Sequence, residues 1–560
     1  MPYNPSSSSK KHLNRIIQDG KEKSLVPPEF KPLMQRILEP IGLISLFSSI
    51  PMAWYNGIYF SVPGILGYFI ISIIVDLFIQ DDHALVRIYG PLGRLRYIFE
   101  EAFRDKYLQY FNETNSDGRP IPRIVRDYIY QKAHNIKPVS SFGTELDIHD
   151  PEITTHSRIL HRNFPGKIIS TSYSVSVGEK RKNIKPFIIK NTINISGMSY
   201  GALNYRAAES LSIGAKDLAY VNTGEGGYGP HGISGNDIVF QIGTGKFGVG
   251  KNAPAHDGTE TRVLDEELLR NLVRDNPNIR MIQLKISQGA KPGLGGVLPG
   301  DKVTPDIAEV RKVAVGKTVY SPAQHTEIIA GSPKESILKL MDFIERIRVI
   351  TELPVGIKLC VGRLEEIDLL AMAMQSTGKG PDAIQLDGAD GGTGAGPNLF
   401  MNYVGYGGAV ETAFYTDKKL KEYGVRDNTV ISVSGRIFSP AHAALAFAAG
   451  ADTIETARGA MLALGCIQAL KCHTNHCPSG ITTHDPWRVR GLDVPEKSTR
   501  VHHYLKGFHE DMIQITKVLG HTDPRDINPA DLRLMSFKDS FQDFFSDDPF
   551  GFRISREYEL

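Results

Sequence analysis

The sequence predicts an α/β protein, a (β/α)8 barrel of the TIM type, preceded by a transmembrane helical hairpin and a helical connecting region. Short apolar, β-branched runs alternate with helix-like stretches from about residue 190 onward, which is typical of parallel strands joined by helices. Residues 41–79 are apolar and nearly free of charge, and their length suits two membrane crossings. A chain of 560 residues can hold a barrel and additional regions.

The overall composition favours a cofactor enzyme over a nucleic-acid-binding protein. The 64 Lys and Arg nearly balance the 62 Asp and Glu, so no general positive field would attract a polyanion. Many of the 54 glycines follow apolar runs, where a backbone must turn tightly or approach a ligand. The 4 cysteines are too few for a disulfide framework, and their clustering indicates metal ligands in a reducing compartment.

The part of the chain before the barrel divides into three predicted regions. These are a disordered basic tail at 1–37, the transmembrane hairpin at 38–80 and the helical connecting region at 81–150. The hairpin's second half, about 58–77, has the length of a membrane span, whereas the first half is shorter and contains two prolines. Basic residues on both flanks predict a cell-membrane protein whose catalytic domain is cytoplasmic, with no cleaved signal peptide. The alternative is a buried helical hairpin of a soluble protein.

Eight strands are predicted within a barrel assigned to residues 151–525, and residues 526–560 are expected to form a C-terminal tail. The predicted strands are Ile193–Ser199, Ala219–Gly224, Ile238–Gly243, Met281–Ser287, Val355–Val361, Ala383–Gly388, Val430–Gly435 and Thr453–Gly459. Their number favours a closed barrel over an open sheet, so active-site residues are expected at the carboxyl ends of the strands.

Glycine-rich segments follow several of these strands. They are SGMSYG at 196–201, NTGEGG at 222–227, KISQGAKPG at 285–293 and DGADGGTGAGP at 387–397. Glycine at these places lets the main chain lie against a flat or anionic ligand. The last two strands end in Ser434-Gly435-Arg436 and Arg458-Gly459-Ala460, where such barrels often hold a phosphate, although ordinary turns are the alternative.

The cysteine segment at 466–477 is the strongest local signal. Cys466, Cys472 and Cys477 form a C-x5-C-x4-C pattern that is followed by proline. Three thiolates suit a three-iron cluster, whereas structural zinc would need a fourth ligand such as a neighbouring histidine. Unligated thiols are the remaining alternative. The isolated Cys360 is expected to be a core thiol.

Polar and charged residues at the strand ends are candidates for substrate binding. Lys285, Gln288, Lys291 and Arg311 could clamp a small dicarboxylate, since guanidinium and ammonium groups bind carboxylates; solvated loop charges are the alternative. Glu225, which has glycine on both sides, is a candidate acid, base or ammonium contact.

Lys358 lies within a predicted barrel strand, where burial of its charge is costly unless a partner compensates it. The partner would be either the electron-rich edge of a reduced flavin or an inward carboxylate such as Asp387. His325 is assigned a structural role.

Taken together, these segments resemble the FMN-binding synthase region of glutamate synthases over about residues 150–520. The hairpin resembles a stand-alone, membrane-associated branch of that family. The matching segments are MSYGA at 198–202, NTGEGG at 222–227, QGAKPG at 288–293, DGGTGAGP at 390–397, and the run from ARGAMLALGC to CHTNHCPSGITT at 457–483.

The resemblance implies FMN-dependent reductive amination of 2-oxoglutarate to L-glutamate, with ammonia supplied from outside. It implies a [3Fe-4S] cluster on Cys466, Cys472 and Cys477 that relays electrons. The expected catalytic residues are Glu225, Lys285 and Lys291, and the expected substrate-binding residues are Gln288, Lys291 and Arg311. The residues expected to bind FMN are Met198, Ser199, Gln241, Lys285, Lys358, Gly391, Gly392, Thr393, Gly435, Arg436, Gly459 and Ala460.

Departures from the large glutamate synthases concern the nitrogen and electron supply. Leu294 and Ser479 stand where those enzymes have an acidic and an aliphatic residue, and no glutaminase is expected in this chain. No G-x-G-x-x-G fingerprint follows a predicted strand, so a nicotinamide site is not expected. The partners would be a separate glutaminase and either a ferredoxin-like donor or membrane quinone.

The alternative functions are a membrane-linked flavin oxidoreductase acting on another amine or 2-oxo acid, and a non-catalytic membrane scaffold.

Overall fold

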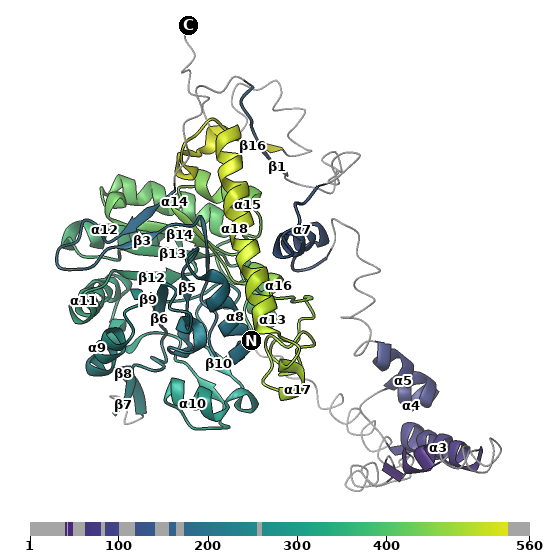
Figure 1. The fold of residues 1–560 in the computed structure, drawn as a ribbon. Coiled ribbons are helices and arrows are strands. Elements are labelled where there is room, and N and C mark those ends of the chain that lie inside the picture. The colour runs from purple at the N-terminus through teal and green to yellow at the C-terminus, as the bar shows by residue number, and fades with distance from the viewer. Residues whose placement is uncertain are drawn as a thin grey trace, which may run out of the picture. The chain divides into compact units, whose positions relative to one another are not determined.

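The computed structural model describes residues 62–79, 84–99, 118–139, 156–163, 173–254 and 260–535, together with helical residues within 38–48. The chain divides into two compact units, residues 1–112 and 113–560, and each is described by itself. Most of the larger unit is a barrel of strands surrounded by helices (Figure 1).

Eight parallel strands close into the predicted barrel. Their order around it is β4–β5–β6–β9–β12–β13–β14–β15, and β15 pairs with β4. The strands are β4 (Ile193–Ile195), β5 (Val221–Asn222), β6 (Ile238–Ile242), β9 (Ile279–Lys285), β12 (Val355–Leu359), β13 (Ala383–Asp387), β14 (Val430–Ser434) and β15 (Thr453–Thr456). All eight predicted strands are confirmed, although each ends before its predicted boundary because the glycine and polar residues there leave the ladder.

The strand sequences explain which side chains enter the barrel. In β13, Ile384 and Leu386 belong to the hydrophobic core, whereas the alternate residue Gln385 forms hydrogen bonds across the barrel interior. Successive side chains of a strand point to opposite faces, so the apolar set packs outward against helices and the polar set faces inward.

Helices that follow the barrel strands surround the barrel. They include α8 (Tyr205–Ala215), α9 (Glu266–Asp275), α11 (Pro333–Thr351), α12 (Leu364–Thr377), α14 (Ala409–Glu422), α15 (Pro440–Ala448) and α16 (Arg458–Ala463). Several start at side-chain caps: Asn204 accepts from Ala207 N, Asp265 from Leu268 N and Ser332 from Glu335 N. Such caps satisfy backbone donors that a helix leaves free in its first turn.

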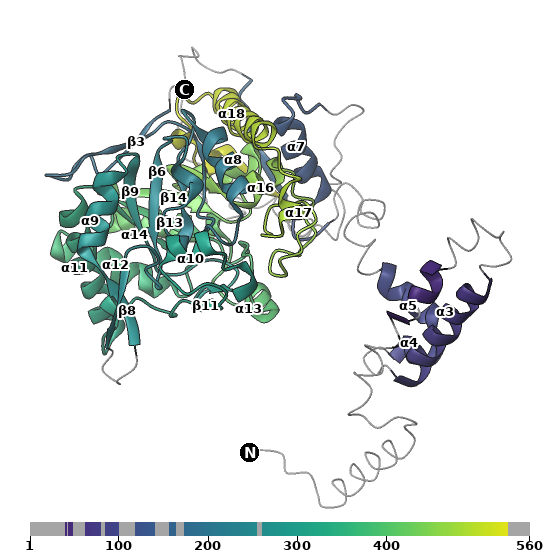
Figure 2. The ribbon, with the colours of Figure 1, turned by 60° about the horizontal axis from the view of Figure 1, so that its bottom comes forward.

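The longest helix, α18 (Val494–Val518), follows the barrel and lies beside α8 (Figures 1 and 2). A Cβ at Gly214 of α8 would lie 2.6 Å from both Ser498 O and Val501 Cβ. The close approach of the two helices therefore requires glycine at that position.

Shorter elements extend from the barrel. Antiparallel pairs are formed by β1 (His156–Ile159) with β16 (Leu532–Met535), β2 (Val175–Val177) with β3 (Phe187–Ile189), β7 (Gly250–Pro254) with β8 (Glu260–Leu264), and β10 (Val297–Leu298) with β11 (Val319–Tyr320). Short helices are α10 (Pro305–Arg311), α13 (Asn398–Tyr403) and α17 (Pro486–Val489). Residues 526–535, predicted to be part of the tail, are therefore ordered up to β16, while 536–560 lie outside the described residues.

The described parts of the predicted connecting region are largely helical. They contain α4 (Ala84–Tyr89), α5 (Pro91–Ile98) and α7 (Arg123–Ala133). Helix α7 belongs to the larger unit and packs on the rest of it, where Lys132 Nζ pairs with Asp511 at 2.7 Å and the Tyr130 hydroxyl donates to Cys466 O at 2.6 Å. The chain just before the barrel thus contacts the predicted cysteine segment.

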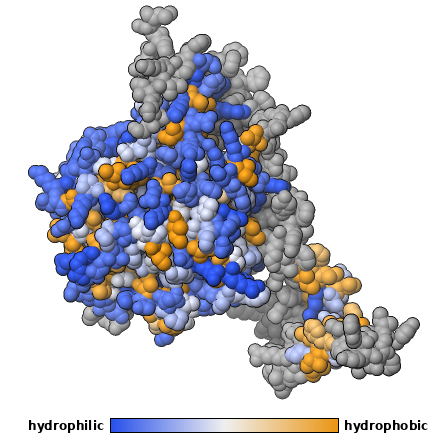
Figure 3. Space-filling view, viewed as in Figure 1, coloured by the Kyte–Doolittle hydropathy of each residue, from blue (hydrophilic) through white to orange (hydrophobic). Residues whose placement is uncertain are grey.

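The smaller unit contains one helix, among its described residues, that is long and apolar enough to cross a membrane. Helix α3 (Val62–Ile74) continues into a π-helical turn, η2 (Val75–Ile79), and the 18-residue stretch has a mean hydropathy of 2.3. Its exposed side chains are mainly apolar and include Leu66, Phe69 and Ile70 (Figure 3). The stretch matches the predicted second span.

The first apolar stretch packs against α3 where it is described. Ser45 Oγ donates to Gly64 O at 3.0 Å, and a Cβ at Gly67 would lie 2.7 Å from Ser45 Oγ. Small residues permit such close helix contacts in membranes. Residues 49–61 lie outside the described residues, as does the whole predicted tail at 1–37, so the first span stays a prediction.

Candidate active site

A cavity of about 850 Å³ opens at the carboxyl ends of the barrel strands. Every strand of the barrel contributes at least one lining residue, either within it or just after it: Ser196, Glu225, Gln241, Lys285, Lys358, Asp387, Ser434 and Glu455. The volume lies within the usual range for sites that bind a cofactor or drug-sized ligand. The expectation from parallel-strand topology, that the strand ends meet in one site, is therefore met.

The cavity brings together most of the residues singled out from the sequence. Those lining it are Met198, Ser199, Glu225, Gln241, Lys285, Gln288, Lys291, Arg311, Lys358, Gly391, Gly392, Thr393, Gly435, Arg436, Cys466, Cys472 and Cys477. Gly459 and Ala460 lie in α16 and do not line it. A Cβ at Gly459 would lie 2.5 Å from the Tyr504 hydroxyl, so this glycine permits α16 to pack on α18.

A belt of side-chain amides crosses the barrel interior at the cavity floor. Gln283 Oε1 accepts from Gln241 Nε2 at 2.7 Å, and Gln283 Nε2 donates to Gln385 Oε1 at 2.9 Å. Gln385 Nε2 then donates to the hydroxyls of Ser196 and Ser434 at 2.9 and 3.0 Å. Each buried amide is satisfied by its neighbours, which rigidifies the floor of the site.

Sequence reasoning missed two members of this belt, Gln283 and Gln385. A signal was present, because the apolar runs VFQIG, MIQLK and AIQLD each carry glutamine one or two residues before the end of the strand. The structure places the glutamines of the first two runs opposite each other in the ladder between β6 and β9.

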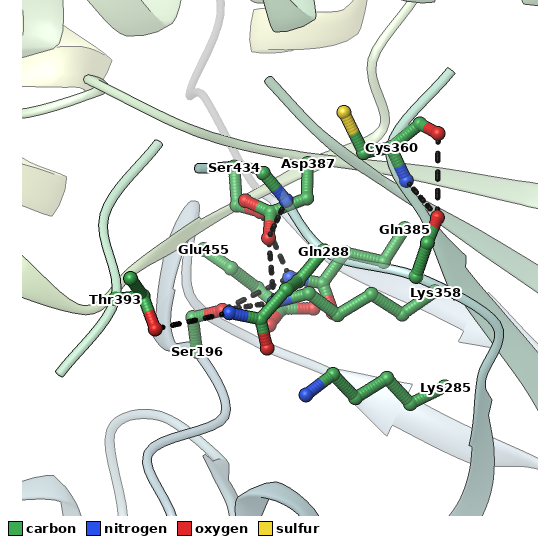
Figure 4. A network of polar contacts seen from close by, with 12 residues as sticks. Ser196, Lys285, Gln288, Lys358, Cys360, Gln385, Asp387, Thr393, Ser434 and Glu455 are labelled. Atoms are coloured by element: carbon green, nitrogen blue, oxygen red, sulfur yellow. Dashed lines mark hydrogen bonds and ion pairs between the residues drawn. The ribbon is translucent and has the colours of Figure 1, made fainter. Parts of the chain in front are cut away.

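Lys358 lines the cavity, where it is buried and ion-paired (Figure 4). Its Nζ lies 3.2 Å from Asp387 Oδ2, and it donates to Ser196 Oγ at 3.5 Å. Asp387 also accepts from Ser434 Oγ at 2.9 Å and from Gly289 N at 3.1 Å. Burial alone would raise the pKa of Asp387, but Lys358 and these donors lower it. Of the two partners considered for Lys358, the inward carboxylate is therefore present.

Glu225 and Lys285 form a second ion pair at the cavity wall. Lys285 Nζ lies 2.6 Å from Glu225 Oε1, and both side chains are mostly buried. Burial alone would raise the pKa of Glu225, but Lys285, Lys291 and Arg311 lower it. A Cβ at Gly243 would lie 2.6 Å from Glu225 Oε2, so glycine opposite the carboxylate makes room for it.

Arg311 reaches the same wall from α10 and is only 4% exposed. Its Nε and Nη2 donate to Tyr200 O at 3.2 and 2.7 Å, and its guanidinium carbon lies 5.0 Å from the centre of the Phe247 ring. Burial lowers the pKa of Arg311 to about 10, and Glu225 partly offsets this effect. Among the described residues no carboxylate lies within ion-pair distance of its guanidinium.

This wall carries an excess of positive charge. Lys285, Lys291 and Arg311 face the single carboxylate of Glu225 across the same cavity. Burial and the charge of Lys285 lower the pKa of Lys291, and the described residues place no carboxylate within ion-pair distance of its Nζ. Three cations against one carboxylate suit a ligand with two negative charges.

Two arginines define another part of the cavity, after β14 and β15. Arg436 Nε lies 3.8 Å from Asp390 Oδ2, and Arg458 Nη2 donates to Asp390 O at 3.1 Å. Burial and the neighbouring Arg436 lower the pKa of Arg458 to about 10. Two guanidiniums beside strand-end backbone suit a phosphate-sized anion in charge and hydrogen-bonding geometry. The sequence placed both arginines in segments expected near a phosphate, but only Arg436 was assigned as an FMN-binding residue.

The three clustered cysteines line the same cavity. Burial raises the pKa of Cys466 to about 12, and the charges of Cys472 and Cys477 add to this effect. Cys466 Sγ accepts from Gln468 N at 3.4 Å, and Cys477 Sγ lies 3.4 Å from the Ser479 hydroxyl. No set of three or more His, Cys, Asp or Glu side chains within the described ranges is gathered closely enough to hold a metal ion.

A buried lysine lies beside these cysteines. Lys302, which is 2% exposed, donates from Nζ to Cys472 O at 2.7 Å and to Thr482 O at 2.6 Å. The buried hydroxyl of Thr482 has no hydrogen-bond partner in the part of the chain that is described. Three thiols on one cavity, with an ammonium group and an unpaired hydroxyl nearby, fit an anionic thiolate-held centre in donor type and charge. Lys302 was not recognised from the sequence.

The segment before α7 also enters the site, which sequence reasoning did not foresee. Arg119, Pro120 and Ile121 line the cavity. Ile121 N donates to Gln468 Oε1 at 3.0 Å, and Gln468 Nε2 donates to Ile121 O at 3.3 Å. This reciprocal pair of hydrogen bonds fixes the cysteine segment to a part of the chain more than 300 residues earlier.

Cys360 and His325 lie in structural settings, as expected. Cys360 is buried, its burial raises the pKa of the thiol to about 12, and it is not among the lining residues. His325 is buried and its Nε2 forms a 3.0 Å hydrogen bond with Lys285 O, so it supports the backbone beneath the Glu225–Lys285 pair.

Comparison with known proteins gives consistent matches. Residues 147–522 match the family described as the conserved region in glutamate synthase. The chain is 34% identical over 483 residues to the glutamate synthase large subunit-like protein YerD of Bacillus subtilis, covering 80% of this chain and 88% of that one. It is 32% identical over 338 residues to the archaeal glutamate synthase (NADPH) of Archaeoglobus fulgidus, covering 59% of each chain.

Two further matches extend these findings. The ferredoxin-dependent glutamate synthase of Cyanidium caldarium is 32% identical over 346 residues, which cover 57% of this chain and 20% of that one. Among solved structures, a mutant flavocytochrome b2 with pyruvate bound matches with a TM-score of 0.40 and 11% identity, covering 79% of this chain and 86% of that one.

Proposed function

The chain belongs to the glutamate synthase family and is an oxidoreductase that acts on CH–NH2 donors, and on that premise we propose that it converts 2-oxoglutarate and ammonia to L-glutamate. The proposed cofactor is FMN. The archaeal relatives match over only 59% of their length, so their names alone do not define the substrates of this chain.

The observation that carries this proposal is the positively charged wall of the cavity. Lys285, Lys291 and Arg311 exceed Glu225 by two positive charges, and 2-oxoglutarate carries two carboxylates. Arg311 and Lys291 would bind these carboxylates, with Gln288 as a further hydrogen-bond donor. Gln288 is held by a 3.2 Å hydrogen bond to the Thr393 hydroxyl.

The residues around Lys358 fit a flavin in charge and in position. When bound, FMN supplies the hydride for reduction at the keto carbon. Lys358 would stabilise negative charge on the ring, while Asp387 keeps this ammonium in place through its 3.2 Å contact. Arg436 and Arg458 would bind the cofactor phosphate, with backbone groups of Gly391, Gly392 and Gly435 close to the same part of the cavity.

Glu225 is suited to the nitrogen side of the reaction. Its pKa is lowered, so it is a carboxylate at neutral pH and can hold ammonium or a protonated amine in the cavity. Its 2.6 Å pair with Lys285 orients the carboxylate. Lys291 lies near enough to influence both groups electrostatically, and it would hold the substrate carboxylate against them.

A [3Fe-4S] cluster held by Cys466, Cys472 and Cys477 is proposed as the electron relay, and it would supply single electrons. The supporting observations are the thiols' shared cavity and the buried cation of Lys302 beside them. Zinc is the alternative occupant of this segment.

Ammonia and electrons would come from outside the chain. The names of relatives mention NADPH and ferredoxin, and the apolar helix Val62–Ile79 adds membrane quinone as a donor for this chain. We propose that the smaller unit holds the protein at the cell membrane with the barrel in the cytoplasm, and that a separate glutaminase or free ammonium supplies nitrogen.

The proposal is tested on full-length protein purified anaerobically in detergent. We expect a flavin absorption spectrum, one FMN per chain, three irons per chain and an EPR signal from the oxidised cluster. With a reduced mediator, 2-oxoglutarate and ammonium should give glutamate. Protein that contains no flavin would contradict the function, and flavin without iron would remove only the cluster.

Replacement of Arg311 tests the substrate assignment. We expect Arg311→Ala to raise the KM for 2-oxoglutarate by about 30-fold or more, because removing one partner of a buried charge contact costs roughly 2–5 kcal/mol. Arg311→Lys should recover part of the loss, and the exposed Arg274→Ala is the matched control. An unchanged KM in Arg311→Ala would show that the guanidinium does not bind the substrate.

A second candidate keeps the cofactors and changes the substrate, with the enzyme acting as a membrane-linked dehydrogenase of another amine or 2-oxo acid that feeds quinone. The apolar helix Val62–Ile79 favours it. Anaerobic assays that compare 2-oxoglutarate plus ammonium with glutamine and other amines separate the two. A non-catalytic scaffold, by contrast, predicts colourless protein.

A further inference from the structure

Glu455 is a buried carboxyl group to which the roles above assign nothing. It belongs to β15, is 1% exposed and lines the cavity. Figure 4 shows it in the same interior network as Lys358, Ser196 and Gln385. A carboxyl group inside a barrel needs compensation, since burial of an isolated charge costs far more than burial of a neutral group.

The two oxygens of Glu455 differ in their surroundings. Oε1 accepts from the Tyr220 hydroxyl at 2.8 Å and from Ser432 Oγ at 3.1 Å. Oε2 is equally buried and has no hydrogen-bond partner among the described residues. An ionised carboxylate would leave this oxygen uncompensated, whereas a protonated carboxyl can carry its hydrogen there and donate it.

The charges around Glu455 favour the protonated form. The charged group that acts on it most strongly is Lys358 of β12, and this ammonium is already paired with Asp387 of β13 at 3.2 Å. No described cation lies within ion-pair distance of Glu455. Burial raises the pKa of Glu455, and Lys358, the hydrogen bonds from Tyr220 and Ser432, and the Ser196 hydroxyl from beyond hydrogen-bond distance offset this only in part.

We propose that Glu455 is a further cofactor-binding residue, a neutral carboxylic acid whose Oε2–H donates a hydrogen bond to an electron-rich group bound in the cavity beside Lys358. Buried acids serve as donors of this kind at sites where negative charge develops. The inference rests on the proposed function, in which that group is the reduced flavin. The O–H bond of Glu455 stays intact, because the proton remains on the carboxyl group. Lys358 acts on the bound group as a cation, and Glu455 acts on it as a neutral hydrogen-bond donor.

The decisive comparison is between Glu455→Gln, which keeps an N–H donor, and Glu455→Met, which removes it at similar size. The readout is the midpoint potential of the flavin in full-length protein at pH 6.5. We expect Glu455→Gln to match the wild type. Glu455→Met should weaken binding of reduced relative to oxidised flavin at least tenfold, which is about 30 mV for a two-electron couple. Ser432→Ala, which alters only the Oε1 side, is the control and should have a smaller effect.

A pH series provides an independent readout if Glu455→Met does not fold. As the pH rises through the raised pKa of Glu455, the wild type gains an anion beside the flavin, so its potential should fall more steeply than that of Glu455→Gln. Equal flavin midpoint potentials in Glu455→Gln and Glu455→Met would overturn the inference. If Glu455→Met does not fold, the inference is overturned when the midpoint potentials of the wild type and Glu455→Gln fall in parallel with pH up to pH 10. Wild-type protein without flavin would instead overturn the proposed function.

Discussion

At the scale of single residues, three carboxyl groups in one barrel are held in different states by their partners. Asp387 and Glu225 each lie within 3.2 Å of a lysine nitrogen, and the pKa of each is lowered. Glu455 has only hydroxyl partners, and its pKa is raised. The pKa values of carboxyl groups in one cavity are therefore shifted in opposite directions, because desolvation raises them and ion pairing lowers them.

His231 illustrates the same principle for a buried base. It is fully buried, its Nε2 forms a 2.9 Å hydrogen bond with Met198 O, and its Nδ1 has no partner among the described residues. Burial lowers the pKa of His231 from 6.5 to about 4. A proton on Nδ1 would meet no acceptor, so the neutral ring is the form that supports Met198 at the cavity wall.

This arrangement predicts a loss of stability in acid. Because the folded pKa lies below the unfolded one, the unfolded chain binds the proton first as the pH falls, and the contribution of His231 decreases between pH 6.5 and 4. By pH 5 the loss is about 2 kcal/mol. Chemical unfolding at pH 7 and 5 should show a smaller loss in His231→Gln, whose amide can still donate to Met198 O. The exposed control His161→Gln should behave like the wild type, and equal pH dependence in all three proteins would contradict the assignment.

At the scale of elements, glycines at the strand ends set how closely the site can be assembled. A Cβ at Gly289, after β9, would lie 1.9 Å from Gly388 O, after β13. Gly243, after β6, faces the Glu225 side chain at a similarly short distance. Other residues can adopt the backbone dihedral angles of these two glycines, so glycine is required there only because a Cβ atom would have no room.

The Gly243 contact yields a prediction. Gly243→Ala places a methyl group 2.6 Å from Glu225 Cβ and Oε2, and the carboxylate should move away from Lys285. We expect a stability loss of about 1–3 kcal/mol, as for other overpacked sites, and a raised KM for ammonium. Gly362→Ala is the matched control, since nothing lies within 4 Å of its Cβ position. Unchanged unfolding and kinetics in Gly243→Ala would argue against a fixed Glu225.

At the scale of the whole molecule, the chain combines a polar catalytic unit with a unit whose helix exposes apolar side chains. Helix α3 leaves Leu66, Phe69 and Ile70 about half exposed. In water such a surface is unfavourable, whereas a lipid bilayer would cover it. Asp76 near the end of this helix is buried and accepts two hydrogen bonds from Arg94 Nε, at 2.8 and 2.9 Å. The charge of Asp76 is thereby compensated within the smaller unit.

Membrane attachment is tested by matched substitutions in the full chain. Ile70→Lys places a charge at the middle of the Val62–Ile79 helix and should disfavour insertion by about 3 kcal/mol. Ile188→Lys, at a similarly exposed apolar residue of β3, should not affect attachment. Sedimentation with membranes and the detergent requirement are the readouts. Equal partitioning of both variants with the wild type would contradict a role for α3 as an anchor.

The sequence predicted the barrel well because its signals are local. Each strand is a short apolar run followed by glycine or a charged residue, and parallel topology alone brings the strand ends together. Glu225, Lys285 and Lys358 could therefore be assigned to one cavity before any distance was known. The positions of Gly459 and Ala460 could not, because the packing of α16 on Tyr504 of α18 lies outside any local pattern.

The residues that were missed interact with partners far away in the chain. Lys302 bonds to the backbone of Cys472, which is 170 residues later, and Ile121 bonds to Gln468, which is 347 residues later. Glu455 had no motif of its own, and its unpartnered oxygen is visible only when all neighbouring side chains are placed. Long-range pairing of this kind leaves little trace in one sequence.

The sequence by itself determined the eight-stranded barrel, the family and the set of charged and thiol side chains at the strand ends, since these depend on residue type and short-range order. Only the tertiary structure decided how those charges combine: Lys358 pairs with Asp387, Lys285 pairs with Glu225, and Glu455 has no cation within ion-pair distance among the described residues. The physical reason is that pairing and desolvation vary over a few ångströms, and such distances are fixed only when the barrel closes.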